Sequence, residues 1–225
     1  MNNARIVSYS EESFSGRIEA GQMLAGELTK FRGKDAIVLG IPRGGIVIAR
    51  EIAFALDARL DIVLTHKLGA PGNPELAIGA ITEDGKIFLN EMLAGRMDAE
   101  SVYLKQEKER QLAVIKRRVE QYRKILAKAP LKDSIVIITD DGVATGATMK
   151  AALWAARRER PKMLIAALPV GPQDTIRELS QEADEVVCLR SPSFFGAIGQ
   201  FYLDFSQVED EEVLEILKKE AERVK

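Results

Sequence analysis

The chain of 225 residues is poor in the side chains that build disulfide-linked or zinc-stapled folds. It has one cysteine, Cys188, and one histidine, His66. A single cysteine excludes an intramolecular disulfide framework and a cysteine-rich zinc site, and a single histidine excludes histidine-pair metal sites such as HExxH. A Ser-His-Asp or Cys-His triad would have to use His66, and no GxSxG elbow accompanies it.

The sequence also lacks long apolar runs and a strong charge of either sign. No apolar stretch approaches the ~18 residues of a membrane-spanning helix, and the N-terminus lacks the apolar core of a signal peptide. We therefore expect a cytoplasmic protein with no membrane partner. A net charge of -2 argues against a dedicated nucleic-acid binder. The length suits one domain, residues 1–225, whose hydrophobic core is large enough to be stable without disulfides or bound metal ions.

What the chain does contain is an alternation of short apolar runs and amphipathic segments. The short runs are typical of strands buried on both faces, and the segments between them have apolar residues at helical spacing. We expect strands at 36–40, 60–65, 135–138, 163–169 and 185–189, and helices at 15–31, 46–56, 145–158, 174–180 and 210–224. This alternation predicts an α/β fold with a doubly wound, mostly parallel central sheet flanked by helices.

The stretch between the second and third expected strands has a different composition. Residues 67–75 are rich in glycine and proline, which predicts a loop, and the runs 76–81 and 86–89 predict a hairpin. A long helix is expected over 99–128, ended by Pro130. The stretch from Lys105 to Lys128 has nine Lys and Arg against three Glu, a pattern more typical of a solvated helix face than of a nucleic-acid surface.

The segment from Ile135 to Thr148 carries the most chemistry. Asp140 and Asp141 end a buried strand, and a loop of small and hydroxyl residues then opens a helix. Such a loop predicts an anion site, most naturally for a phosphate, at the carboxyl end of the sheet. The two carboxylates suit a vicinal diol or a magnesium-bound ligand. A phosphate beside a diol describes a ribose 5-phosphate, whereas the simpler alternative is an Asp-Gly turn followed by a helix cap.

The string from Thr139 to Thr148, TDDGVATGAT, resembles the phosphoribosyl-pyrophosphate motif of type I phosphoribosyltransferases. The resemblance implies that Asp140 and Asp141 are catalytic and hold the ribose hydroxyls, with magnesium as cofactor. It also implies a phosphate cradle, which comprises Gly142, Val143, Ala144, Thr145, Gly146, Ala147 and Thr148.

Other landmarks of the resemblance follow in order along the chain. The segment Ile41-Pro42-Arg43-Gly44-Gly45 is similar to the family's first strand-to-helix loop, which implies pyrophosphate binding by Arg43, Gly44 and Gly45. Lys67 is implied as a further pyrophosphate contact, and Arg43 and Lys67 join the catalytic set. The resemblance also implies a mobile flap over about 67–97.

The family's acceptor-binding hood is expected from about 1–15 and 190–225. Its aromatic candidates for stacking on a flat ring are Phe194, Phe195, Phe201 and Tyr202, although aromatics that close the core are an equal alternative. Family members that use 6-oxopurines carry an Asp directly before the motif's Thr-Gly, where this chain has Ala144. The resemblance therefore disfavours hypoxanthine, guanine and xanthine as acceptors.

The resemblance predicts an enzyme that moves a phosphoribosyl group from 5-phosphoribosyl 1-pyrophosphate (PRPP) to a nitrogen acceptor and releases pyrophosphate. The alternative is a regulatory protein that binds PRPP and transfers nothing. Small-molecule substrates are the expected partners, and a homodimer is compatible with the resemblance.

Overall fold

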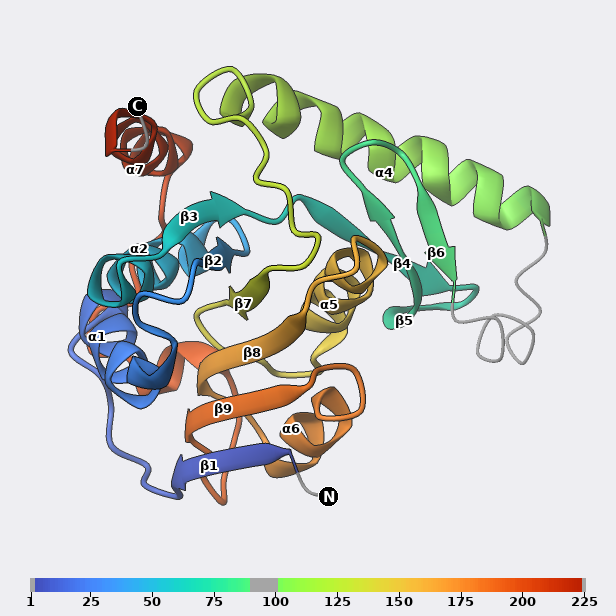
Figure 1. The fold of residues 1–225 in the computed structure, drawn as a ribbon. Coiled ribbons are helices and arrows are strands. Elements are labelled where there is room, and N and C mark those ends of the chain that lie inside the picture. Colours follow the sequence, from blue (N-terminus) through green and yellow to red (C-terminus); the bar gives the residue numbers. More distant parts are fainter. Residues whose placement is uncertain (1–2, 90–100, 224–225) are drawn as a thin grey trace.

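The computed structural model describes residues 3–89 and 101–223, and its central feature is a six-stranded parallel sheet (Figure 1). The strand order is β1-β9-β8-β7-β2-β3, and every neighbouring pair is parallel. The strands are β1 (Ala4–Ser8), β2 (Ala36–Gly40), β3 (Arg59–Ile62), β7 (Ile135–Thr139), β8 (Met163–Val170) and β9 (Glu185–Arg190). The predicted fold class is confirmed.

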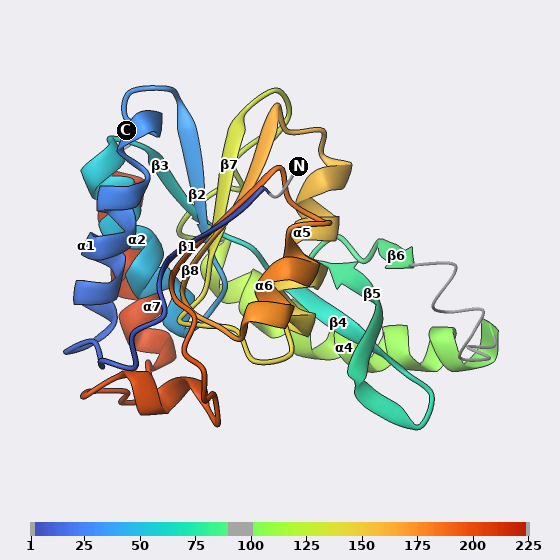
Figure 2. The ribbon, with the colours of Figure 1, turned by 90° about the horizontal axis from the view of Figure 1, so that it is seen from below.

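Helices cover both faces of this sheet, so the body of the molecule has three layers (Figure 2). On one face lie α1 (Arg17–Glu27), α2 (Gly44–Leu56) and α7 (Asp210–Arg223), and on the other lie α5 (Ala147–Arg158) and α6 (Gln173–Leu179). Each face has its own apolar core, centred on residues such as Leu24 and Ile48 on one side and Met149 and Leu153 on the other. The inner strands β2, β7 and β8 are almost entirely apolar because both of their faces are buried, whereas the edge strand β1 alternates partly buried and exposed residues.

A second, antiparallel sheet extends from the end of β3. It comprises β4 (Thr65–Ala70), β5 (Asn73–Thr82) and β6 (Ile87–Leu89), and it packs against α4 (Ser101–Tyr122) and α5. The hairpin expected at 76–89 is confirmed. The loop expected at 67–75 is wrong, because Leu68 and Ala70 are fully buried strand residues and the turn is confined to the residues between β4 and β5. Of the flap predicted over 67–97, residues 90–97 lie outside the described part.

Two further boundaries differ from the sequence-based expectation. Residues 4–8, placed in the hood by the resemblance, form the edge strand β1 and pair with β9. The long helix ends at Tyr122 rather than near Pro130. Beyond this end, Arg123 binds the buried carboxylate of Asp61 at 2.6 Å, and the backbone N–H of Ala129 donates to the same carboxylate at 2.8 Å.

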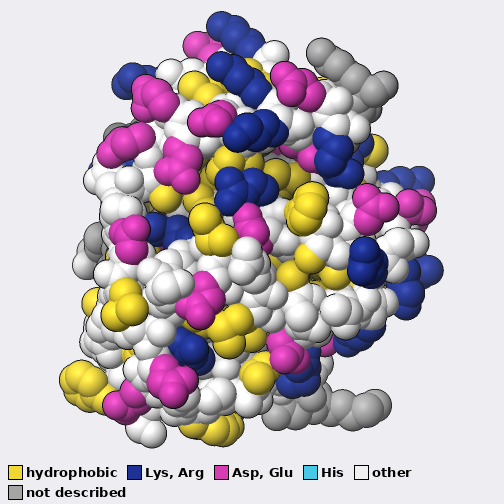
Figure 3. Space-filling model, turned by 90° about the vertical axis from the view of Figure 1, so that its left-hand side faces the viewer, with side chains coloured by type: hydrophobic (Ala, Val, Ile, Leu, Met, Phe, Trp, Pro, Cys, Tyr) yellow, Lys and Arg dark blue, Asp and Glu magenta, His cyan; other side chains and the backbone are white. Residues whose placement is uncertain are grey.

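The surface shows mixed charge on the side formed by α1, α2 and α7 (Figure 3). Lysine and arginine side chains are interspersed there with aspartate and glutamate, so this face offers no continuous basic surface for a nucleic acid. Among the described helices, none is both long and apolar enough to cross a membrane.

Candidate functional site

The candidate site lies where the order of the central strands reverses. The strands β2 and β7 are neighbours, and the chain leaves β2 toward β3 on one side and β7 toward β8 on the other. At this point the loops after β2 and β7 share the carboxyl edge, where the backbone N–H of Ile41 donates to the carbonyl of Thr139 at 3.0 Å. Crevices of this kind are where open α/β sheets bind ligands.

The two loops touch through Gly44 and Gly45, which follow a cis Pro42–Arg43 peptide. A Cβ at Gly44 would lie 2.1 Å from Oδ2 of Asp141, and one at Gly45 would lie 2.8 Å from the carbonyl oxygen of Thr139. These distances leave no room for a side chain. The sequence needs two glycines here because the acidic pair packs directly on the start of α2.

Asp141 is held by residues from distant parts of the chain. Its Oδ2 accepts hydrogen bonds from Nη2 and Nε of Arg17 at 2.9 and 3.1 Å, and its carbonyl accepts one from the Tyr202 hydroxyl at 2.6 Å. The Arg17 guanidinium also donates to the carbonyl of Ser206 at 2.8 Å and lies 4.2 Å from the centre of the Phe205 ring. Residues 205–206 of the C-terminal segment therefore hold the Arg17 guanidinium, which in turn holds the Asp141 carboxylate.

Sequence reasoning missed Arg17. It lies 124 positions from Asp141, and no local pattern connects the two residues. Only the packing of α1 against the carboxyl end of the sheet brings the guanidinium to the diacid.

The electrostatics of the diacid oppose full ionisation. Burial raises the pKa of Asp140 well above its ordinary value, the Asp141 carboxylate raises it further, and Arg17 acts in the opposite direction. Burial likewise raises the pKa of Asp141, again opposed by Arg17. Two adjacent carboxylates in this setting have a strong affinity for a cation or for hydroxyl donors.

The loop after the diacid forms a cradle at the start of α5. Its inner side is fixed, because the backbone N–H of Val143 donates to the carbonyl of Val170 at 2.9 Å and the Thr175 hydroxyl donates to the carbonyl of Ala144 at 2.7 Å. Gly146 has φ +72°, a conformation that favours glycine. The outer side, with Ala144, Thr145 and Thr148, is exposed at the helix N-terminus, where backbone N–H groups lack intrahelical partners.

Beside the cradle is a cavity of about 210 Å³. It connects the first loop, the β3–β4 segment, α4 and the first turn of α5. Its lining residues are Ile41, Pro42, Val63, Leu64, Thr65, His66, Lys67, Ile115, Arg118 and Thr148. The structure thus brings Lys67 to the same space as Pro42 and Thr148, as a shared ligand requires. Arg43 is not among these residues, and its Nη1 pairs with Oε2 of Glu209 at 3.2 Å.

Comparisons with known proteins agree with this geometry. The family model described as "Phosphoribosyl transferase domain" matches residues 17–206, which include both loops and the C-terminal segment. The chain belongs to the phosphoribosyl transferase family.

Individual relatives extend the match over most of the chain. Two curated Mycobacterium tuberculosis proteins, from strains CDC 1551 and H37Rv and provisionally named phosphoribosyl transferases, are each 42% identical over 92% of this chain. The match covers 46% of each relative, so the chain spans about half of their length. The crystal structure of TT1426 from Thermus thermophilus is 43% identical, with a TM-score of 0.87 over 92% of this chain and 98% of that one.

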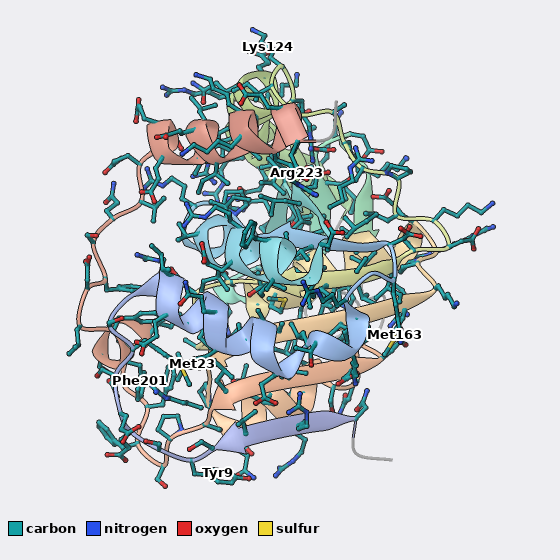
Figure 4. The ribbon with its side chains drawn as sticks, turned by 60° about the vertical axis from the view of Figure 1, so that its left-hand side comes forward. Tyr9, Met23, Lys124, Met163, Phe201 and Arg223 are labelled. Carbon is teal, nitrogen blue, oxygen red and sulfur yellow. The ribbon has the colours of Figure 1, made fainter. Side chains whose placement is uncertain are left out.

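For a phosphoribosyl transferase, the aromatic residues near the C-terminus were the expected acceptor contacts, and two of them do not fit that role. Phe201 and Tyr202 are 1% and 5% exposed. Phe201 stacks on Phe195 with ring centres 5.3 Å apart, and Tyr202 packs between Phe14 and Phe205. Figure 4 shows Phe201 at the carboxyl end of the strands, opposite Met163, so its position is near the site although its ring is enclosed.

Of the four aromatic candidates, Phe194 offers the most free surface. Its side chain is 74% exposed, and the partly buried Phe195 packs against the core. The aromatic residues between 194 and 202 do lie close together, as their spacing in the sequence suggested. The sequence alone could not distinguish rings that face a ligand from rings that pack in the core.

The residues present fit a magnesium ion that arrives with its ligand. Among the described residues, no group of three or more His, Cys, Asp or Glu side chains is placed to hold a metal. Asp140 and Asp141 supply two carboxylates, which is the number of protein ligands that Mg²⁺ commonly takes when phosphate and water oxygens complete its octahedron.

Proposed function

We propose that this chain transfers the 5-phosphoribosyl group of PRPP to a nitrogen acceptor and releases pyrophosphate. One observation carries the proposal: the partly buried diacid, the glycine loop of α2 and the cradle of α5 meet at a single crevice. Each part matches one part of PRPP, namely the ribose diol, the pyrophosphate and the 5-phosphate. Membership of the phosphoribosyl transferase family supports the same assignment.

The residues divide the work by position. The cradle from Gly142 to Thr148 would bind the 5-phosphate with backbone N–H groups and hydroxyls. Asp140 and Asp141 would accept hydrogen bonds from the ribose hydroxyls, with Arg17 and Tyr202 as positioning residues for Asp141. The amides of Gly44 and Gly45 and the side chains of Arg43 and Lys67 would bind the pyrophosphate.

Catalysis then rests on position and charge. The bond between the anomeric carbon and the pyrophosphate oxygen breaks, a bond from that carbon to the acceptor nitrogen forms, and the acceptor's N–H proton leaves to solvent. Positive charge that develops on the ribose ring is stabilised by the nearby carboxylates, and the departing pyrophosphate by the cations. Magnesium, bound with PRPP and held by Asp140 and Asp141, would supply further neutralisation of the pyrophosphate.

The acceptor is proposed as a nucleobase or a related nitrogen heterocycle outside the 6-oxopurines. Ala144 is exposed in the cradle and has no group that can accept or donate a proton to a purine. The exposed Phe194 is the aromatic surface on which a flat acceptor could stack. A cytoplasmic location and a homodimeric state stay predictions.

The test is pyrophosphate release from PRPP and Mg²⁺ in a screen of nitrogen heterocycles. We expect release with at least one acceptor and none from the variant with Asp140→Asn and Asp141→Asn. PRPP binding by calorimetry without release for any acceptor would instead support the regulatory alternative. Absence of PRPP binding in the wild-type protein would contradict both functions.

A further inference from the structure

The cavity beside the phosphate cradle contains a cation that the sequence placed on a solvated helix face. Arg118 belongs to α4 and lines this cavity together with Lys67 and Thr148. Arg118 reaches the cavity because it lies on the inward-facing side of α4. This side contains three buried residues, Gln111, Ile115 and Tyr122, which are 7%, 4% and 0% exposed. Arg118 follows Ile115 by three residues and precedes Tyr122 by four, so it falls on the same face of the helix. The neighbouring Lys116 and Arg117 are exposed.

The charges around the cavity have one sign. Its titratable lining side chains are His66, Lys67 and Arg118, and no carboxylate is among the lining residues. Within residues 3–89 and 101–223, Arg118 forms no ion pair with a carboxylate. Arg123, about one turn further along the chain, instead binds both Asp61 and Glu83. Placing a partly buried guanidinium next to a lysine costs free energy unless an anion binds between them.

The position of the cavity indicates which anion would bind there. Pro42 belongs to the first loop and Thr148 to the cradle, so the cavity opens between the parts that would hold the pyrophosphate and the 5-phosphate. Planar guanidinium groups bind phosphate oxygens through two parallel hydrogen bonds, which a lysine cannot do.

We propose that Arg118 of α4 binds the pyrophosphate group of PRPP and the pyrophosphate product. The proposal rests on the proposed function. It also gives α4 a functional reason to pack against β4 and the cavity, because the helix would carry a substrate contact in addition to covering the second sheet.

The experiment compares Arg118→Gln with Arg117→Gln, an exposed neighbour on α4 that loses the same charge. Calorimetry with magnesium pyrophosphate, PRPP and ribose 5-phosphate is run on each variant and on the wild type. We expect Arg118→Gln to weaken pyrophosphate and PRPP binding by about tenfold or more while ribose 5-phosphate binding stays within about twofold. Arg117→Gln should change none of the three by more than about twofold. Arg118→Lys, which keeps the charge without the planar fork, should fall between Gln and wild type.

Several outcomes separate this proposal from the proposed function. Equal pyrophosphate affinity in Arg118→Gln and Arg117→Gln overturns the role of Arg118, even if the wild type binds PRPP. A parallel loss of ribose 5-phosphate in Arg118→Gln also overturns it, because the effect would then be structural. Pyrophosphate binding that depends on Arg118 in a protein that binds neither PRPP nor ribose 5-phosphate supports the anion contact and contradicts the transferase.

Discussion

At the scale of single residues, the candidate site contains two neighbouring carboxyl groups whose ionisation lowers the stability of the fold. Asp140 and Asp141 are adjacent, partly buried and only partly balanced by Arg17. A carboxyl whose pKa is higher in the folded than in the unfolded chain binds more protons when folded, so its contribution to stability is lost as pH rises from its ordinary pKa through the folded value. We infer that the site is maintained for binding at the expense of stability.

We therefore predict that Asp140→Asn stabilises the protein at neutral pH. Asparagine keeps the oxygen that accepts the backbone N–H of Asp141 at 2.9 Å, and it removes a carboxyl whose ionisation is opposed by desolvation and by the neighbouring carboxylate. The melting temperature should rise by about 2–4 °C for each kcal/mol recovered, with little change near pH 4. Melting curves of both proteins from pH 4 to 8 measure this. A difference that does not grow with pH would contradict it.

Glycines at the loop contact give a second residue-scale prediction. In an exposed helix position, Gly→Ala stabilises a protein by up to about 1 kcal/mol. Gly26→Ala should behave so, because a Cβ there meets nothing within 4 Å. Gly45→Ala should instead destabilise by about 1–3 kcal/mol, because its Cβ would clash with the Thr139 carbonyl and Asp140 Cα. Urea unfolding compares the two variants, and similar effects of both substitutions would rule out a close contact at Gly45.

At the scale of elements, the inner strands of the central sheet were predictable from the sequence. They form short apolar runs, and the segments between them have apolar residues at helical spacing. The sequence did not predict β1, whose burial alternates between partly buried and exposed residues at the edge of the sheet. Nor did it predict β4, because Gly69, Pro71 and Gly72 signal a turn while only the last two lie between strands. The motif located the diacid and the cradle. Arg17 and Arg118 depend on long-range packing that local patterns do not encode.

The burial of β4 and β5 predicts a protected second sheet even without ligand. Leu68, Ile78 and Ile81 are fully buried and form a small core with Ile115 of α4. Opening this sheet would expose these side chains, so its local free energy of opening should be well above zero. Native-state hydrogen exchange of the ligand-free protein should show slow amides in both strands. Exchange as fast as in an unfolded peptide would show that the segment is a mobile flap as the sequence suggested.

The start of α7 competes with the proposed pyrophosphate for Arg43. The pair between Arg43 and Glu209 is partly exposed, so its contribution to folding is at most about 1 kcal/mol. Glu209→Gln should leave the free energy of unfolding nearly unchanged and tighten pyrophosphate binding by up to about fivefold. Glu215→Gln is the control, since it breaks the Glu215–Lys219 pair of α7 away from the site. Calorimetry in low salt decides, and equal affinities of the two variants would exclude this competition.

At the scale of the whole molecule, the site joins two parts of the fold that share only one strand pair in the central sheet. The β7-β8-β9-β1 part supplies the diacid and the cradle, whereas β2 and β3 supply the glycine loop and lead to Lys67. A ligand that spans the crevice therefore adds contacts between the two parts that the free protein lacks. Because it binds only the folded chain, it should stabilise the entire fold and not one loop.

We accordingly predict that PRPP with Mg²⁺ raises the melting temperature as a single cooperative transition. At a hundredfold excess over its dissociation constant, a ligand stabilises by about 2.7 kcal/mol, which corresponds to about 5–10 °C for a chain of this size. Ribose 5-phosphate, which would contact only the diacid and the cradle, should shift the transition less. The variant with Asp140→Asn and Asp141→Asn should show no shift with either ligand. If PRPP leaves the wild-type transition unmoved across a concentration series, the two parts of the sheet do not share a donor site, and the assignment of the crevice to PRPP fails.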